Sequence, residues 1–150
     1  MSLQAKPFSA ISQSVNTTVQ AVTNVAAALA EFDTSTGTPV EISEGGMSAA
    51  PATAVVTAPD TGVYLCLLTA TITPPAVTHT VTLSIQKATT NIGGTVNTHV
   101  CVASTEFTLA THAVVRLVAG ETVRPAIVSS DAGPQNYTVD EATFTVIRIA

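Results

Sequence analysis

The chain is poor in charged residues. Only 10% of its 150 residues are Asp, Glu, Lys or Arg, whereas about 25% is typical of soluble domains. Charge is a common protection against self-association, so a monomer of this composition would tend to stick to itself. We therefore expect other subunits to cover part of the apolar surface, which favours an obligate oligomer.

Basic residues are especially scarce, with 5 Lys and Arg against 10 Asp and Glu and a net charge of −5. So few cations cannot neutralise a phosphate track or an anionic membrane surface. No apolar run approaches the roughly 18 residues of a membrane-spanning helix, and Met1–Lys6 lacks the apolar core of a secretion signal. We expect synthesis in a cytoplasm and neither nucleic acid nor membrane as a partner.

Catalytic and metal-binding patterns are also missing. There is no G-x-S-x-G nucleophile motif and no phosphate-cradling glycine loop. The dispersed His79, His99 and His112 lack metal-pair spacing and are expected at the surface or at an interface, with a metal on a threefold axis as the alternative. Asp140 and Glu141 are expected to be solvated at the start of the last strand, with a bound ion as the alternative. We expect no enzyme, cofactor or metal site.

The two cysteines, Cys66 and Cys101, lie in strand-like segments. In a chain without a secretion signal they are expected to be reduced, buried and similar to Val in their packing. A disulfide between them stays open at this point, because it depends on the separation of their Cα atoms.

From about Thr53 onward the apolar residues alternate as in half-buried strands, and turn signals recur at the spacing of a β-sandwich. About eight strands are expected. The alternation predicts which side chains point into the core. They are Val81, Leu83 and Ile85 in His79–Lys87, and Val96, Val100 and Val102 in Thr95–Ala103.

One segment, Val63–Leu68, is apolar at nearly every position, which indicates a strand that is buried on both faces. The opposite sheet of a sandwich can cover one face. The other face needs a neighbouring subunit or a second layer from the same chain, and both alternatives stay open. Val63, Leu65 and Leu67 are expected to face one side of this strand, and Tyr64, Cys66 and Leu68 the other.

The N-terminal third is ambiguous. Apolar residues from Ile11 to Leu29 follow a 4-3-4-3-4 spacing, as in a short coiled-coil seam. Val, Thr and Asn dominate this stretch, however, and these are poor helix formers. We favour a strand with an extended arm over a helix, and divide the chain into an arm at 1–24 and a β domain at 25–150.

Three phrases, each joining a turn to a β-branched run, resemble the jelly-roll superfamily of the complement globular heads and tumour necrosis factor. They are Pro59–Leu65, Val118–Val123 and Phe144–Ile149. In that family a Gly-Val-Tyr step opens a central strand, as Gly62-Val63-Tyr64 does here. A later Ala-Gly-Asp step corresponds to Ala119-Gly120-Glu121, a conservative departure. The resemblance covers roughly residues 25–150.

The resemblance implies an antiparallel jelly-roll sandwich that assembles as a homotrimer. The last strand of the family carries a Phe near the trimer axis, and Phe144 occupies the matching place. Together with the second face of the central strand, this gives an expected trimer interface of Tyr64, Cys66, Leu68 and Phe144.

Versions of this family occur on bacteriophage particles, and a small, charge-poor, Thr-rich chain without a targeting signal looks like them. The expected function is a virion protein that decorates or cements a capsid by contacting the major capsid protein. Contacts from the arm are expected at Leu3, Lys6, Phe8 and Ile11. The alternative is a receptor- or glycan-binding head of a phage tail or head fibre, which would use the loops at 129–136 and 89–94.

Overall fold

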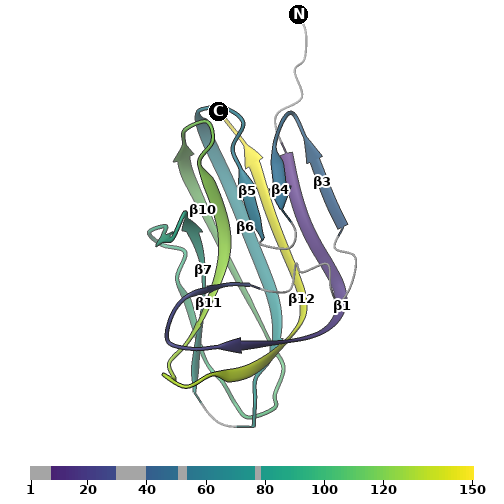
Figure 1. The fold of residues 1–150 in the computed structure, drawn as a ribbon, viewed down its shortest axis with the longest axis vertical. Helices are drawn as coiled ribbons and strands as arrows, with labels where there is room; N and C mark the ends of the chain where they lie inside the picture. Colours follow the sequence, from purple (N-terminus) through teal and green to yellow (C-terminus); the bar gives the residue numbers. More distant parts are fainter. Residues whose placement is uncertain (1–7, 30–39, 51–53, 77–78) are drawn as a thin grey trace, which may run out of the picture.

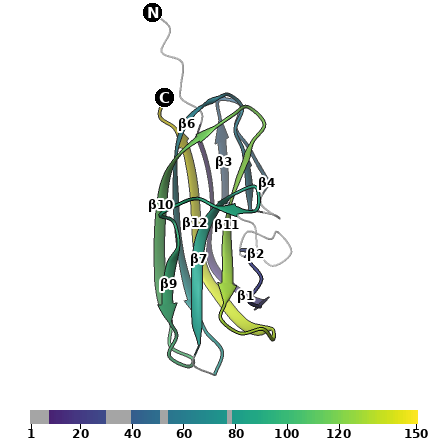
Figure 2. The same ribbon diagram turned by 90° about the vertical axis from the view of Figure 1, so that its left-hand side faces the viewer.

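The computed structural model describes residues 8–29, 40–50, 54–76 and 79–150, and every regular element in these ranges is a β-strand. The strands form two antiparallel sheets packed face to face (Figures 1 and 2). The expected all-β jelly-roll sandwich is therefore confirmed. No helix that could cross a membrane occurs within these described ranges.

The first sheet has five strands, and its central members are the longest in the molecule. In spatial order they are β10 (Phe107–Leu117), β6 (Gly62–Thr73), β12 (Gln135–Arg148), β1 (Phe8–Val22) and β3 (Val40–Glu44). Neighbours in this order are far apart in the sequence, so the sheet is held together by long-range pairing.

The second sheet follows the order β4 (Ser48–Ala50), β5 (Val55–Thr57), β11 (Thr122–Ser129), β7 (Thr80–Lys87) and β8 (Thr90–Asn91). Two short strands lie off this path: β2 (Ala27–Ala28) pairs with β11, and β9 (Asn97–Val100) pairs with β7. Figure 2 shows β9 alongside β10, at the side where the two sheets approach each other.

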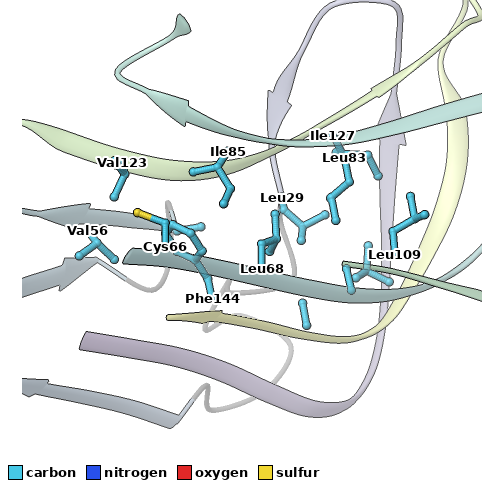
Figure 3. Close-up of a cluster of buried hydrophobic side chains, with 14 of the residues drawn as sticks. Leu29, Val56, Cys66, Leu68, Leu83, Ile85, Leu109, Val123, Ile127 and Phe144 are labelled. Atoms are coloured by element: carbon cyan, nitrogen blue, oxygen red, sulfur yellow. The ribbon is translucent and has the colours of Figure 1, made fainter. Parts of the chain in front are cut away.

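The core fills the space between the sheets, and it follows the alternation in the sequence. Cys66, Leu68 and Phe144 of the first sheet point toward Leu83, Ile85 and Ile127 of the second (Figure 3), and all six are at most 1% exposed. The inward parity expected for β7 is confirmed, because Val81, Leu83 and Ile85 are fully buried.

The expected N-terminal arm does not describe Phe8–Val22. This segment is β1, which pairs with β12 along nearly its whole length and with β3 on its other side. It therefore lies inside the first sheet, and the boundary drawn at residue 24 cuts through the domain. The β propensity of its Val and Thr residues prevails over the seam-like spacing. The helix alternative is also excluded for this segment.

The expected parity of the strand after residue 95 is wrong. Val96, Val100 and Val102 are 53%, 64% and 62% exposed, while Cys101 is fully buried. The reason is the register: His99 lies opposite Val81 of β7. Directly opposed residues project to the same face. His99 therefore follows Val81 inward, and Val100 follows its partner Thr80 outward, with Val96 and Val102 at the same parity.

Candidate assembly surface

The outer face of the first sheet has an apolar half. It is formed by Val114 of β10, Leu65 and Leu67 of β6, and Ile147 of β12; Val114 and Ile147 both lie opposite Leu65 in the register. Val114 is 62% exposed and Leu67 is 40% exposed, while Leu65 and Ile147 are half-buried. In the single chain, the second face of the apolar strand β6 is thus left without a full cover.

Further along the same strands the outer face becomes polar. Thr69 and Thr71 of β6 lie beside Thr143 and Glu141 of β12. The hydroxyl oxygen of Thr71 lies 3.0 Å from that of Thr108 on β10, at hydrogen-bonding distance. The outer face is therefore more apolar near the end of β12, where His112 and Arg116 of β10 also lie, and threonine-rich near its middle.

The four residues expected at a trimer interface lie inside the single chain. Tyr64, Cys66, Leu68 and Phe144 are at most 1% exposed and belong to the core between the sheets. The sequence predicted that both faces of β6 would be covered. The opposite sheet covers the face that carries Tyr64, Cys66 and Leu68. A neighbouring copy can reach only the opposite, outward face of β6, which carries Leu67.

A second apolar surface lies at the neighbouring edge of the sandwich. We call it the β9 edge; it consists of the exposed side chains of Val96, Val100 and Val102. It is joined to β10 by two hydrogen bonds: Asn97 Nδ2 donates to the Ala110 carbonyl at 2.9 Å, and Thr111 Oγ1 donates to the Thr95 carbonyl at 2.7 Å. These two bonds place the β9 segment beside β10.

An open groove of about 400 Å³ lies at the same side of the sandwich, between the β7–β8 hairpin and β10. It is lined by Lys87, Ala88, Thr90, Asn91, Ile92 and Val115. Ile92 and Val115 pack against the core from this side. At the rim, Lys87 Nζ lies 2.6 Å from Glu121 Oε2, and this contact lowers the pKa of the Glu121 carboxyl. The ion pair leaves little net charge at the groove.

The three histidines occupy different environments. His112 is exposed on the outer face, as expected. His99 is half-buried and stacks on Phe107 with ring centroids 4.2 Å apart. His79 departs from the surface expectation, because its side chain is only 2% exposed and Nδ1 lies 3.5 Å from Asp131 Oδ2. Among the described residues, no cluster of three His, Cys, Asp or Glu side chains is suited to a metal ion.

The acidic pair Asp140 and Glu141 lies in the middle of β12 rather than at its start. The register against β6 shifts between Val139 and Glu141, so Asp140 sits at a bulge. Its Oδ2 accepts a hydrogen bond from the Thr73 hydroxyl at 2.8 Å. Asp140 therefore has a structural partner on the neighbouring strand.

Both cysteines are free and buried, so the open question of a disulfide is answered in favour of the reduced form. Burial raises the pKa of the Cys66 thiol to about 12 and raises the pKa of the Cys101 thiol as well. The thiolate is the reactive form of cysteine. Neither side chain is therefore suited to nucleophilic chemistry near neutral pH.

The residues expected to contact a capsid through an arm are only partly placed. Leu3 and Lys6 lie outside the described residues. The backbones of Phe8 and Ile11 pair with Ile147 and Phe144 of β12, respectively. Sequence reasoning also missed the β9 edge, for which the only signal was the alternation of valines with Asn97, His99 and Cys101.

No protein-family profile matches the chain, and no curated protein matches its sequence. Solved structures do match. The globular domain of zebrafish complement 1qA protein has a TM-score of 0.62 at 17% identity, covering 97% of this chain and 98% of that one. Eiger TNF from S. frugiperda has a TM-score of 0.57 at 16% identity over 97% and 94% of the two chains.

Murine APRIL at pH 5.0 has a TM-score of 0.57 at 11% identity, and the match covers 97% of this chain and all of that one. At these identities the likeness concerns the fold alone. It nevertheless spans nearly the whole chain, including β1. The chain therefore has the jelly-roll fold shared by complement globular heads and the tumour necrosis factor family.

Proposed function

We propose that this protein is a non-enzymatic structural subunit that assembles as a homotrimer. The observation that carries the proposal is the clustering of exposed apolar side chains. Of the nine large hydrophobic residues that are exposed in the described chain, five lie on the outer face or the β9 edge. They are Leu67, Val96, Val100, Val102 and Val114. Exposed apolar side chains that gather on particular surfaces are typical of protein interfaces.

A cyclic trimer requires two different surfaces on each copy, because its contacts are heterologous. The outer face and the β9 edge meet this requirement, since they are distinct and both carry exposed apolar side chains. In the proposed ring, the β9 edge of one copy packs on the apolar half of the outer face of the next. Burial of these side chains would supply the association energy.

We further propose that the trimer decorates or cements a bacteriophage capsid by binding the major capsid protein. Three features support this: the small number of charges, the likeness to a fold that also occurs on phage particles, and the exposed polar surface that remains outside the proposed interface. Three equivalent contacts per trimer would act together, so weak single contacts suffice for stable attachment. The protein would then reside on the virion after synthesis in the host cytoplasm.

Two measurements test these proposals separately. The mass of the purified protein in solution, from light scattering across a concentration series, should correspond to three chains; a single chain at high concentration would overturn the assembly. Adding the protein to undecorated capsids should raise their resistance to heat. A trimer that fails to bind capsids would overturn the decoration role alone.

The second candidate function is a receptor- or glycan-binding head of a phage fibre. It is favoured by the groove, because Thr90, Asn91 and Ile92 of the expected binding loop line it. It is weakened by Tyr137, which is fully buried and cannot serve as an aromatic platform for a sugar. Copy number distinguishes the two functions: hundreds of copies per particle indicate decoration, and a handful indicates a fibre.

A further inference from the structure

The second sheet carries a polar cluster on the face that points away from the core. Arg124 of β11 lies opposite Gln86 of β7 in the register, and Figure 2 shows these two strands side by side. Both side chains point outward, because their neighbours Val123 and Ile85 are fully buried in the core. We call this group the Arg124 cluster; its members are Ser84, Gln86, Asn91 and Arg124.

Hydrogen bonds hold the guanidinium group of Arg124 in one orientation. Its Nε and Nη2 donate to Gln86 Oε1 at 3.1 and 2.9 Å. Gln86 Nε2 in turn donates to Asn91 Oδ1 at 3.0 Å, and Ser84 Oγ donates to the same oxygen at 3.1 Å. Gln86 and Ser84 are only 3% exposed, so packing restricts both side chains. Such support from packed, hydrogen-bonded neighbours is what prepares a side chain for binding.

The charge of Arg124 is not neutralised within the part of the chain that the structure describes. The acceptor on Gln86 is a neutral amide oxygen, whereas the ion pairs of Lys87 and Arg148 use the carboxylates of Glu121 and Asp60. A guanidinium group has five N–H donors. The contacts with Gln86 use two of them, which leaves three on Nη1 and Nη2 for an acceptor from outside these residues.

The remaining donors suit a carboxylate. The edge formed by Nη1 and Nη2 presents two parallel N–H groups, which match the two oxygens of a carboxylate in a bidentate contact. A nucleic acid backbone would require several cations. The cluster offers one, and the net charge of the chain is −5. A single acidic side chain therefore fits this site better than a polyanion does.

We propose that the Arg124 cluster is a docking site for a carboxylate side chain, Asp or Glu, of a partner protein. The inference goes beyond the proposed function, because the cluster is complete in one chain and belongs to neither the outer face of the first sheet nor the β9 edge. Under the proposed decoration role the partner is the major capsid protein. Three such sites on a trimer would then act together.

The first experiment measures carboxylate binding at the Nε–H signal of Arg124 by NMR. Sodium acetate replaces sodium chloride stepwise at constant ionic strength, so that only the anion changes. The Arg124 signal should shift and saturate. The signal of Arg116, an exposed arginine of β10 that Gln86 does not orient, should shift less and without saturation. Equal shifts at the two arginines would overturn the site.

The second experiment supplies the carboxylate from within the cluster. Gln86→Glu replaces the neutral acceptor by a carboxylate of the same shape, which pairs with Arg124 and should lower its affinity for acetate by at least about tenfold. Thr82→Glu is the matched control. It adds the same charge to the same face of β7, opposite Val128 and about 13 Å from position 86, and it should bind acetate like the parent.

A third variant keeps the positive charge and removes the fork. Arg124→Lys should lower the affinity for acetate by about tenfold as well, because an ammonium group cannot make the bidentate contact. Circular dichroism and thermal unfolding verify that each variant is folded. Arg124→Lys keeps the test decisive if Gln86→Glu fails to fold, and acetate binding unchanged in Arg124→Lys would overturn the site.

A further variant separates a partner's carboxylate from one of the chain's own. Glu31 and Asp33, which lie outside the described residues, are the first acids after β2, the neighbour of β11. If the parent binds no acetate and the double variant Glu31→Gln, Asp33→Asn does, the chain itself occupies the cluster and docking of a partner is overturned. Absence of binding in both proteins overturns the site altogether.

Undecorated capsids then test the identity of the partner. Capsid binding that Arg124→Lys weakens and Thr82→Glu leaves unchanged supports docking on the major capsid protein. Saturable acetate binding without any binding to capsids supports the carboxylate site and overturns the decoration role. The site and the proposed function can therefore fail independently.

Discussion

The hydroxyl of Tyr64 donates a hydrogen bond to the backbone carbonyl oxygen of Asp60, 2.7 Å away. This bond ties the start of β6 to the turn that precedes it. The same turn is held from the end of β12, where Arg148 Nη1 contacts Asp60 Oδ2 at 3.1 Å and Nη2 donates to the Thr61 carbonyl at 3.2 Å. Tyr64 is thus an internal anchor of the fold.

Replacing Tyr64 by Phe removes this hydrogen bond and keeps the ring in the core. The free energy of unfolding should fall by about 1 kcal/mol, the usual net contribution of one hydrogen bond. Urea denaturation of the parent and the variant measures the difference, and the oligomeric mass should stay unchanged. A variant that unfolds like the parent but fails to assemble would instead place Tyr64 at a subunit contact.

Gly62 is required by a close approach of the chain. A Cβ atom at this position would lie 2.5 Å from the Ala150 carbonyl oxygen and 2.7 Å from Arg148 Nε. Gly62→Ala should therefore lower the free energy of unfolding by about 1–3 kcal/mol, as overpacking does. Gly93→Ala is the matched control, since a Cβ there meets nothing within 4 Å. Equal midpoints of denaturation for the two variants would contradict the proposed clash.

Leu67 and Leu68 are adjacent in β6 but face opposite ways, so their substitutions should have opposite consequences. Leu68→Ala removes a fully buried core side chain and should cost about 2–5 kcal/mol of stability. Leu67→Ser changes an outer-face side chain that is 40% exposed, and it should weaken association while the fold of each chain persists. Denaturation measures the stability of both variants, and analytical ultracentrifugation measures their association. The parity assignment would be refuted if Leu67→Ser destabilised the chain as much as Leu68→Ala.

The stability of the protein should decrease in alkaline solution. Burial raises the pKa of Cys66 from 9.0 to about 12 and that of Tyr137 from 10.0 to about 12. The unfolded chain therefore releases these protons at lower pH than the folded chain does. Stability is complete below the ordinary values and is lost as the pH rises from about 9 toward 12.

Denaturation curves recorded between pH 7 and pH 11 measure this loss. Cys66→Val and Tyr137→Phe each remove one of the two groups, so each variant should show a flatter dependence on pH than the parent. Identical slopes in the parent and both variants would mean that other groups cause the alkaline loss.

Much of the fold could be predicted because it follows from local alternation. The inward positions of β7, and the antiparallel sandwich itself, follow from the period-two pattern of Val, Leu and Ile. The turn at Pro59–Leu65 was visible as a motif, and the structure explains it by the tight contact at Gly62 and the hydrogen bond of Tyr64. These features depend on residues that are close together in the sequence.

The candidate assembly surface was harder to predict, because alternation divides a strand into two faces without saying which one is inside. For β6 both faces are apolar, and the interior face proved to be that of Tyr64, Cys66 and Leu68. For β9 the pattern favoured buried valines, and pairing of His99 with Val81 reversed it. β1 was likewise ambiguous until its pairing with β12 was known.

The sequence by itself determined that the chain forms a charge-poor, all-β sandwich. It also indicated that some apolar side chains, as on the second face of β6, would not be buried in the core of a single chain. This follows from composition and from the period of the pleat, which are local properties. Only the tertiary structure decided which apolar side chains remain outside, because the direction of a side chain depends on the register between strands far apart in the chain. That register leaves Leu67 and Val114 exposed on the first sheet and Val100 exposed on the second.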